Sequence, residues 1–255
     1  MNRTNTQGSV DNEDVERFSR IAEEWWDERG KFLPLHQINP VRLRYIREQI
    51  EARFGRSADG AAPLTGLTLL DIGCGGGLIA EPLSRLGAAV TGIDASEKNI
   101  QVAGAHAKNM SLTIDYRATT AEALSQSVAS FDVVLALEVI EHVADVPFFL
   151  ETIAALVKPG GLLIITTLNR TLKSLLMAKI GAEYILRWLP IGTHDWQQFL
   201  RPSEIIAPLQ SLGLSHTDLC GMVFSPLKNQ WRLDASDVTV NYLVSFHKPR
   251  VDSQK

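Results

Sequence analysis

A regular alternation of short apolar strands with helical segments, between residues 67 and 167, constrains the fold more than any other feature of the chain. Strands are expected at 67–72, 88–93, 112–116, 131–137 and 162–167. Helices are expected between them, at 78–86, 97–108, 121–127 and 147–157. Repeated strand–helix units of this length place the strands parallel and the helices on both faces of the sheet. The pattern predicts an α/β fold with a doubly wound, mostly parallel, Rossmann-like sheet.

The alternation stops after the fifth expected strand. Residues 168–202 are too long for a simple connection and predict a helical insertion. A helix is expected at 203–212, and further strands at 214–219 and 238–247. With these two strands the expected sheet has seven.

The chain before the first strand divides into two parts. Residues 1–13 are polar and are expected to be disordered. Residues 14–62 are expected to form N-terminal helices that cover the ligand site of the main domain, residues 63–255. The first of these helices has an apolar stripe, which consists of Phe18, Ile21, Ala22 and Trp25. The pair Asn39-Pro40 is typical of a helix start and predicts that a second helix begins there.

Composition limits the classes of function. Of the 255 residues, 45% are hydrophobic, which is typical of a globular protein with a buried core. The formal net charge is −4, so no broad surface for nucleic acid is expected. The two cysteines, Cys74 and Cys220, make no disulfide framework and fit a reducing compartment. No secretory signal and no apolar run of roughly 18 residues is visible, so a cytoplasmic location is expected.

A glycine-rich turn follows the first expected strand. It is the segment Asp71-Ile72-Gly73-Cys74-Gly75-Gly76-Gly77. Glycines let the backbone approach a ligand closely, and ligands of open α/β sheets bind beyond the carboxyl ends of the strands. The second strand leads to Asp94, an acid that can accept hydrogen bonds from ribose hydroxyls. The combination predicts a nucleotide-type cofactor held between Gly73, Gly75 and Asp94.

Two cofactors compete for this pattern. A dinucleotide fingerprint requires a glycine at its sixth position, where this chain has Leu78. The pyrophosphate of a dinucleotide would also lie poorly beside Asp71, whereas the positively charged methionine moiety of S-adenosylmethionine would be stabilised by that carboxylate. The turn therefore favours S-adenosylmethionine over NAD, and a tight turn without a ligand is the third alternative.

Several segments carry a resemblance to known proteins. The glycine-rich turn, the segment Glu138-Val139-Ile140-Glu141-His142-Val143 and the turn Lys158-Pro159-Gly160-Gly161 resemble motifs of class I methyltransferases. Three further segments narrow the choice. They are Trp25-Trp26-Asp27, Leu35 to Leu43, and Gly181 to Leu186 with Gly192-Thr193-His194-Asp195 after it. Together they are similar to the ubiquinone-biosynthesis O-methyltransferase family of proteobacteria, over nearly the whole chain after residue 13.

The resemblance implies two O-methylations of polyprenylated, catechol-type quinone precursors. It also implies cofactor contacts, by position, at Arg42, Gly73, Asp94 and Leu137. Arg42 could pair with the carboxylate of the cofactor or be a surface arginine, and Leu137 could instead be a core residue. The acid that follows the third strand in many class I enzymes has no clear counterpart in the run 118–122, which leaves the adenine contact open.

A candidate catalytic turn follows the fourth strand. A phenol with a pKa of about 10 is ionised in only about one molecule in a thousand at pH 7, so its methylation needs roughly 4 kcal/mol of help from a base or a metal. Glu138, Glu141 and His142 would share one face if this stretch were a helical turn. They could hold a divalent cation such as Mg²⁺ or Zn²⁺, which lowers the pKa of catechol oxygens. Alternatively His142, with Glu141 beside it, acts as the general base, or the turn is structural. Weaker candidates are His36 and the pair His194-Asp195.

The insertion carries a charged stripe on an otherwise apolar segment. Lys179, Glu183 and Arg187 are spaced to share one side of a helix. From Arg170 to Arg187 there are four basic residues and one acid, in a chain that is acidic overall. This composition predicts that residues 173–188 dock on anionic lipid at the inner membrane. The alternative is a lid packed over the active site.

These observations lead to one expected function and three alternatives. We expect a cytoplasmic, peripherally membrane-associated O-methyltransferase of ubiquinone synthesis that uses S-adenosylmethionine. Its expected partners are a polyprenylated phenol or quinol, membrane lipid and other proteins of ubiquinone synthesis. The alternatives are a methyltransferase acting on another small phenol, an NAD-dependent oxidoreductase, and a catalytically silent scaffold of the same fold.

Overall fold

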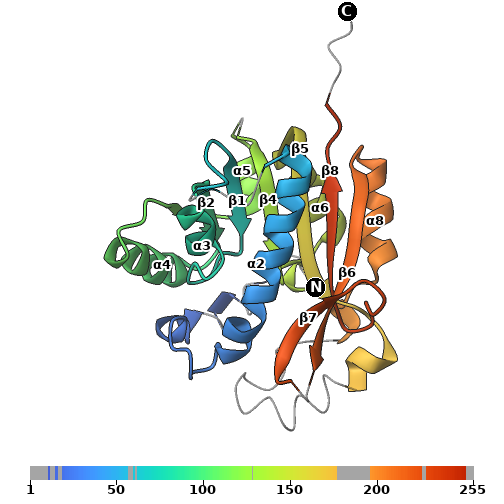
Figure 1. Cartoon of the computed structure of the whole chain (residues 1–255), viewed down its shortest axis with the longest axis horizontal. Helices are drawn as coiled ribbons and strands as arrows, with labels where there is room; N and C mark the ends of the chain where they lie inside the picture. Colours follow the sequence, from blue (N-terminus) through green and yellow to red (C-terminus); the bar gives the residue numbers. More distant parts are fainter. Residues whose placement is uncertain are drawn as a thin grey trace, which may run out of the picture.

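An eight-stranded sheet with helices on both faces forms the body of the molecule (Figure 1). The computed structural model describes residues 11, 15–16, 19–56, 60, 62–127, 129–176, 196–225 and 228–250. The strands are β1 (Thr68–Ile72), β2 (Ala89–Asp94), β3 (Asp115–Ala118), β4 (Phe131–Leu137), β5 (Val157–Leu168), β6 (Ser215–Ser225), β7 (Gln230–Asp234) and β8 (Asn241–His247). The helices that lie wholly within the described residues are η1 (Ala22–Glu24), α2 (Leu33–Phe54), α3 (Ala80–Arg85), α4 (Glu97–Asn109), α5 (Ala121–Ser125), η2 (Ile140–His142), α6 (Val146–Leu156), η3 (Trp196–Gln198) and α8 (Pro202–Ser211).

The sheet is parallel in one part and antiparallel in the other. Its strand order is β3-β2-β1-β4-β5-β8-β6-β7. Strands β1 to β5 pair in parallel, whereas β8 is antiparallel to β5, and β6 and β7 continue the antiparallel part. The order reverses between β1 and β4, and at such a point the connections leave a crevice beyond the carboxyl ends of the strands. The expected fold class is confirmed, but the expected number of seven strands is wrong.

The eighth strand is β7, which pairs with β6 at the edge of the sheet. Trp231 and Leu233 are half-buried, whereas Gln230, which precedes Trp231, and Arg232, which lies between the two, are exposed. Two apolar residues in a five-residue segment are too weak a period to mark a strand in the sequence. Strand β6 runs to Ser225, whereas it was expected to end at 219. Its added length pairs with β7 and holds these residues in a strand.

Other boundaries of the sheet also differ from those expected. Strand β3 lies at Asp115–Ala118 rather than 112–116, and β8 begins at Asn241 rather than 238. Strand β5 begins at Val157, so the turn expected at 158–161 lies within the strand, where the pairing with β4 shifts register. A turn signal of glycine and proline can therefore mark an irregularity inside a strand as well as a connection.

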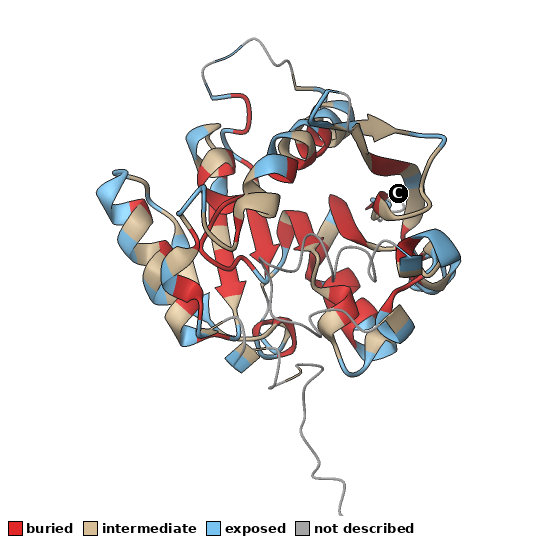
Figure 2. Cartoon of the chain, turned by 90° about the horizontal axis from the view of Figure 1, so that it is seen from below, coloured by how far each residue is buried: buried red, intermediate tan, exposed pale blue. Residues whose placement is uncertain are grey.

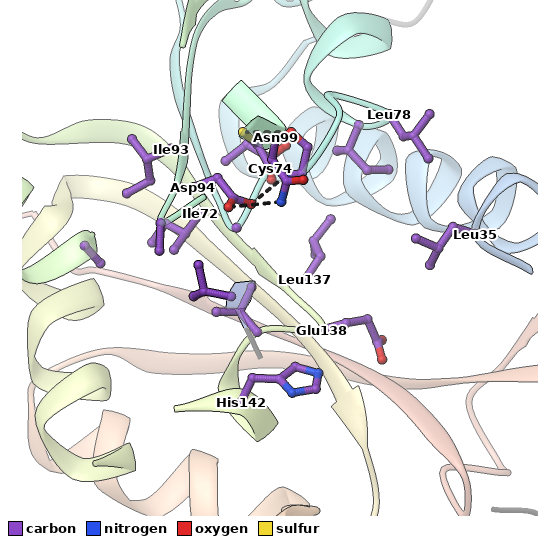
Figure 3. Close-up of a pocket in the computed structure, with 18 of the residues that line it drawn as sticks. Leu35, Ile72, Cys74, Leu78, Ile93, Asp94, Asn99, Leu137, Glu138 and His142 are labelled. Carbon is purple, nitrogen blue, oxygen red and sulfur yellow. Dashed lines mark hydrogen bonds between the residues drawn. The ribbon is translucent and has the colours of Figure 1, made fainter. Parts of the chain in front are cut away.

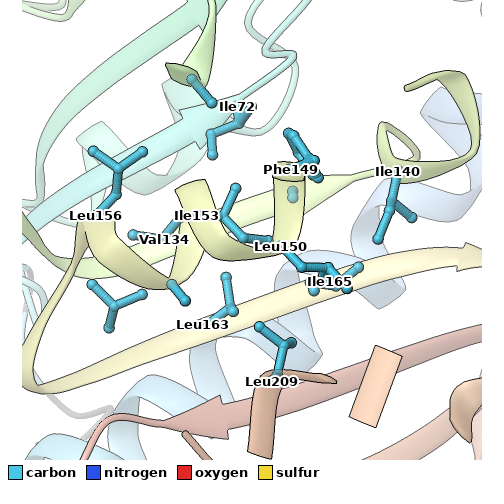
Figure 4. Packing of buried hydrophobic residues seen from close by; sticks show 14 of the residues in the cluster. Ile72, Val134, Ile140, Phe149, Leu150, Ile153, Leu156, Leu163, Ile165 and Leu209 are labelled. Carbon is cyan, nitrogen blue, oxygen red and sulfur yellow. The ribbon is translucent and has the colours of Figure 1, made fainter. Parts of the chain in front are cut away.

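Apolar side chains fill both faces of the sheet. Leu70 and Val134 pack with α5, α6 and α8, whereas their neighbours Leu69 and Val133 pack with α2 and α3 on the opposite face. Figure 2 shows the buried residues concentrated in the central strands, and Figure 4 shows Ile153 of α6 among the side chains of the first of these faces. Strands buried on both faces are apolar throughout, which is why they are visible in the sequence.

Helix α2 begins earlier than expected, at Leu33 rather than at Asn39-Pro40. Pro34 lies in its first turn, a position that proline favours, so the chain contains two proline signals and the earlier one starts the helix. Pro40 lies in the helix interior, where it cannot donate the usual backbone hydrogen bond. Burial of side chains such as Ile46 against the sheet stabilises the helix across this position.

The N-terminal segment before α2 is helical at Val15, Glu16 and Ser19 and continues into the short turn η1. Its apolar side chains form a separate cluster with the residue that directly follows the glycine-rich turn. The buried members are Ile21, Ala22, Trp25, Phe32 and Leu78. Phe18, which was expected in the same stripe, lies outside the described residues. The cluster seats the N-terminal segment beside the crevice.

Candidate active site

A cavity of about 300 Å³ lies at the carboxyl ends of β1, β2 and β4. The glycine-rich turn, the residues after β2, β3 and β4, and the N-terminal segment with the start of α2 line it. The six residues predicted to bind the cofactor all belong to this lining. They are Arg42, Asp71, Gly73, Gly75, Asp94 and Leu137. Figure 3 shows Asp94 on one side and Glu138 and His142 on the other, with Leu137 between them.

The glycine-rich turn bends sharply at the carboxyl end of β1. Gly73 and Gly75 have φ of 67° and 53°, a region that residues with side chains rarely adopt. The N–H of Cys74 donates to the carbonyl of Ile93 over 3.0 Å, which ties the turn to β2. A side chain at Gly73 would collide with Val139. Glycine is therefore required here both by backbone conformation and by space.

Asp94 ends β2 and accepts hydrogen bonds from three groups. Its Oδ2 accepts from the N–H of Gly75 at 3.0 Å, and its Oδ1 accepts from the N–H of Ser96 at 2.8 Å and from Nδ2 of Asn99 at 3.2 Å. Burial raises the pKa of Asp94, and these hydrogen bonds oppose the rise. The carboxylate is thus held in one orientation at the wall of the cavity.

Asp71 is a buried acid, only 3% exposed, on the floor of the same turn. Its Oδ2 has no hydrogen-bond partner among the described residues. Burial, and then the negative charge of Asp94, raise the pKa of Asp71 to about 7. An enclosed carboxylate of this kind is stabilised by a nearby cation. The floor of the cavity therefore fits a positively charged ligand.

Arg42 reaches the cavity from α2 and forms an ion pair with Glu138. Its Nη2 lies 2.7 Å from Oε1 of Glu138, and its Nη1 donates to Oδ1 of Asn39 at 3.3 Å. Its Nε is buried and has no hydrogen-bond partner among the described residues. The guanidinium is therefore already neutralised in part, yet it retains a free donor.

The turn after β4 does not form the helical face that the predicted site of Glu138, Glu141 and His142 requires. Glu138 has φ of 55° and precedes the short turn η2, so Glu138, Glu141 and His142 are not stacked on one side of a helix. Besides Arg42, Oε1 of Glu138 accepts from the hydroxyl of Thr166 at 3.0 Å. A non-glycine residue in this backbone region stores strain, and such residues are frequent at functional sites.

Glu141 and His142 lie on different sides of this turn. His142 lines the cavity (Figure 3). Glu141 does not line it and is only 2% exposed, with Oε2 accepting from the hydroxyl of Thr167 at 2.8 Å. Its Oε1 has no hydrogen-bond partner among the described residues, and burial raises the pKa of this carboxyl. Glu141 therefore lies behind the wall of the cavity.

The predicted metal ligands are not arranged around one point. Within the described residues, no three His, Cys, Asp or Glu side chains are grouped so that they could hold a metal ion. A cation held by Glu138, Glu141 and His142 would require Glu138 to leave Arg42 and Glu141 to turn toward the cavity. The donor types and the unpartnered Oε1 of Glu141 suit a cation, but the arrangement described is not a preformed metal centre.

Two residues that sequence reasoning missed complete the wall beside Asp94. Trp25, from the N-terminal segment, and Asn99, in the first turn of α4, both line the cavity. Asn99 lies five positions after Asp94, and Trp25 belongs to one of the segments that carried the family resemblance, but no local pattern relates the two.

The weaker candidate His36 contacts the carbonyl of Trp25 through Nε2 at 2.9 Å. On the side of β3, residues 119–122 line the cavity, and they are four of the five residues in the run 118–122 that was left open for adenine.

The insertion after β5 is described only at its two ends. Residues 177–195, including the charged stripe and the pair His194-Asp195, lie outside the described residues. Lys173 forms an ion pair with Asp237 at 2.9 Å, so this cation of the predicted lipid-binding segment is engaged. Leu172 and Leu176 are 75% and 59% exposed. Among the described helices, none has the length and apolarity needed to cross a bilayer.

Comparison with other sequences places the chain among methyltransferases. Residues 70–165 match a family described as "Methyltransferase domain". The ubiquinone biosynthesis O-methyltransferase of Sinorhizobium fredii is 53% identical over 241 residues, which cover 94% of this chain and 97% of that protein. The protein of the same name from Caulobacter vibrioides is 56% identical over 241 residues, which cover 94% of this chain and 95% of that protein.

Comparison with solved structures supports the fold. The magnesium protoporphyrin IX methyltransferase of Synechocystis, solved with bound SAH, has a TM-score of 0.61 at 20% identity, covering 93% of this chain and 94% of that one. A SAM-dependent methyltransferase of Thermotoga maritima has a TM-score of 0.61 at 18% identity, covering 92% of this chain and 99% of that one. At such low identities the likeness concerns the fold alone.

Proposed function

The chain belongs to the ubiquinone biosynthesis O-methyltransferase family, and from that premise we infer that it transfers the methyl group of S-adenosylmethionine to a hydroxyl group of a quinol-type intermediate in ubiquinone biosynthesis. One observation carries the assignment to this site. The buried acid Asp71, the glycine-rich turn and the fixed carboxylate of Asp94 surround a single cavity. That arrangement suits a ligand with a positive charge at one end and ribose hydroxyls at the other.

We propose a specific placement of the cofactor. Asp71 faces the positively charged methionine moiety, Gly73 and Gly75 allow the backbone to approach it, and Asp94 accepts hydrogen bonds from the ribose. Arg42 binds the carboxylate of the cofactor through the donor that Glu138 leaves free. Leu137 packs against the cofactor at the end of β4. The burial of Asp71 and Arg42, each with an atom that lacks a partner among the described residues, supports this placement.

The cofactor assignment is tested at Asp94. Asp94→Asn removes a charged acceptor, and hydrogen bonds to charged groups contribute about 1.5–3 kcal/mol, so the Kd for S-adenosylmethionine should rise roughly 10- to 150-fold. Calorimetry on the folded variant measures this change. Asp115→Asn, at an exposed acid of β3 whose carboxylate forms an ion pair with Arg117, is the matched control and should bind as the unmodified protein does. An unchanged Kd in Asp94→Asn contradicts the placement.

The reaction requires the acceptor hydroxyl to lose its proton as its oxygen attacks the methyl carbon and the carbon–sulfur bond breaks. We propose that the turn 138–142 provides this help, which amounts to roughly 4 kcal/mol for a phenol at pH 7. We propose His142 as the group that accepts the proton, and its position in the lining of the cavity supports this role. In the alternative, the two glutamates and His142 rearrange to hold a divalent cation that lowers the pKa of the hydroxyl.

A chelator experiment separates these two roles. If His142 is the base, methylation persists in excess EDTA and His142→Ala lowers kcat by about 100-fold or more, with the affinity for S-adenosylmethionine retained. If a cation is required, EDTA abolishes methylation of the unmodified protein and added Mg²⁺ or Zn²⁺ restores it. Normal turnover by His142→Ala in the presence of EDTA would remove both roles from this turn.

We further propose that the substrate carries a polyprenyl tail and that the enzyme meets it at the inner membrane through residues 173–188. The family resemblance supports the proposal, as does the exposure of Leu172, which directly precedes this segment, and of Leu176 near its start. A liposome flotation assay tests it, with anionic and neutral vesicles compared at low and high salt. Because Lys173 is paired with Asp237, the informative variant is Lys179→Glu with Arg187→Glu. If that variant floats as the unmodified protein does, the segment is better assigned as a lid.

A further inference from the structure

The indole of Trp25 is linked to Asp94 through one intervening side chain. Nε1 of Trp25 donates to Oδ1 of Asn99 at 3.0 Å, and Nδ2 of Asn99 donates to Oδ1 of Asp94 at 3.2 Å (Figure 3 shows the second bond). An indole nitrogen can only donate, so the amide oxygen of Asn99 must face Trp25 and its NH₂ group must face Asp94. Trp25 therefore decides which way the amide of Asn99 is turned.

Both members of this link are enclosed. Trp25 is 8% exposed and Asn99 is 2% exposed, so neither can exchange its partner for bulk water at low cost. Of the roughly four acceptor positions of a carboxylate, Asp94 uses three for Gly75, Ser96 and Asn99. The remaining position belongs to Oδ2, which is therefore the atom left to accept a hydroxyl from a ligand.

The ring of Trp25 is fixed on two sides, which fixes the direction of its N–H. One face stacks on Phe32 with a centroid distance of 3.9 Å and an interplanar angle of 10°. Toward the glycine-rich turn the fit is so close that a side chain at Gly75 or Gly76 would collide with Trp25. The next residue, Trp26, donates from Nε1 to the carbonyl of Gly76 at 3.0 Å. The two tryptophans thus hold the N-terminal segment against the turn that forms the cavity.

We propose that Trp25 is a positioning residue for the cofactor, which acts through Asn99 to orient the carboxylate of Asp94 toward the ribose. The proposal rests on the proposed function, because it takes the ligand of Asp94 to be the ribose of S-adenosylmethionine. It assigns to the N-terminal segment a part in cofactor selection as well as a part in covering the cavity. The consequence is that the ribose hydroxyls are recognised correctly only when this segment is docked.

The test compares two ligands in variants that retain the aromatic ring. Trp25→Phe keeps the contact with Phe32 and the glycine-rich turn but removes the N–H. S-adenosylhomocysteine and its 2′,3′-dideoxy analogue are titrated by calorimetry. A neutral hydrogen bond contributes about 0.5–1.5 kcal/mol, so Trp25→Phe should raise the Kd of S-adenosylhomocysteine about 2- to 12-fold and leave that of the dideoxy analogue unchanged. In turnover, the KM for S-adenosylmethionine should rise while kcat is retained.

Two further variants separate positioning from packing. Trp26→Phe removes the neighbouring indole N–H, whose acceptor is Gly76, and should change the binding of both ligands by the same factor. Asn99→Leu should reproduce the selective loss, and adding Trp25→Phe to it should cause no further loss, because both changes break one link. The variant Asn99→Leu also keeps the test valid if Trp25→Phe fails to fold.

The outcomes distinguish this proposal from the proposed function. Equal weakening of both ligands by Trp25→Phe, or additive effects of Trp25→Phe and Asn99→Leu, would overturn the positioning role. If the unmodified protein binds both ligands equally, the assignment of Asp94 to the ribose is wrong. The positioning role of Trp25 then fails with it, because the link through Asn99 would orient a carboxylate that does not bind the ribose. If it binds neither, the proposed function itself fails at this site.

Discussion

At the scale of single residues, the site depends on acids whose burial opposes their ionisation. Asp71 is enclosed beneath the glycine-rich turn, and its pKa is raised to about 7 by burial and by the charge of Asp94. A raised folded-state pKa means that the folded protein binds a proton more tightly than the unfolded chain does. Stability attributable to Asp71 therefore falls as pH rises from about 3.8 to about 7, and a bound cation offsets that cost.

Cofactor binding should consequently release a proton from Asp71. Near pH 6 most of the free protein carries that proton, and a bound cation lowers the pKa of the carboxyl, so we expect release of close to one proton per cofactor and an affinity that increases up to about pH 7. Calorimetry in buffers of different ionisation enthalpy measures the release. Asp71→Asn should abolish it. Proton uptake, or release that persists in Asp71→Asn, would place the titrating group elsewhere.

Glu141 gives a second pH-dependent expectation. Burial, and then the charge of Glu138, raise the pKa of Glu141, so ionisation of this carboxyl costs stability as pH rises. Glu141→Gln cannot ionise, so its Tm relative to the unmodified protein should be higher at pH 9 than at pH 5. Thermal unfolding at the two pH values measures this difference. Glu151→Gln, at an exposed position of α6, is the control and should show no such trend. A difference that is constant with pH would refute the expected cost of ionisation.

At the scale of elements, the antiparallel part of the sheet depends on one close approach at Gly221. This residue pairs with Asp234 of β7 and Tyr242 of β8, and a side chain on it would overlap the carbonyl of Asp237. The loop that holds Asp237 also supports the start of the insertion, since Thr171 donates to the carbonyl of Thr239 at 2.7 Å. Strand β7, that loop and the first residues of the insertion therefore form one connected unit.

Gly221→Ala should destabilise this unit. Overpacking of a closely fitted site costs about 1–3 kcal/mol, and here the neighbouring atom is backbone, so we expect a loss at the upper end of that range. Chemical denaturation measures the free energy of unfolding. Gly104→Ala, on α4 where a new Cβ would meet nothing within 4 Å, should instead stabilise the protein by about 0.5–1 kcal/mol. Equal effects of the two changes would contradict the packing argument.

At the scale of the whole molecule, the N-terminal part contributes to two different structures. Helix α2 belongs to the main core, with Ile38, Ile46 and Ile50 buried against one face of the sheet. The segment before it forms its own small cluster around Trp25 and closes the wall of the cavity beside Asn99. The division of the chain at residue 62 remains a prediction. The clusters suggest that the segment before α2 is the separable part.

A truncation tests this division. Removal of residues 1–32 leaves α2 and the main core intact, so the chain should still unfold cooperatively, but its affinity for S-adenosylmethionine should fall by at least about 10-fold because an enclosing wall is lost. Removal of residues 1–10 is the control and should leave affinity unchanged. Circular dichroism and calorimetry provide the two readouts. A truncated chain that binds with full affinity would show that the N-terminal segment takes no part in the site.

The sequence by itself determined the α/β class, the family and which residues line one side of the cavity, because those features are local. Apolar runs, the glycine-rich turn and Asp94 at the end of a strand can each be recognised within a few residues. Once the strands are parallel, their carboxyl ends meet at one edge, so Gly73, Asp94 and Leu137 come together without further information.

Only the tertiary structure decided which partners those residues have. Arg42 pairs with Glu138 across 96 positions, and Trp25 contacts Asn99 across 74. Glu141 faces Thr167 behind the cavity, and β7 exists because β6 lies beside it. No period or motif in the sequence marks these contacts. Each depends on how separate elements pack and on which polar atoms that packing removes from water.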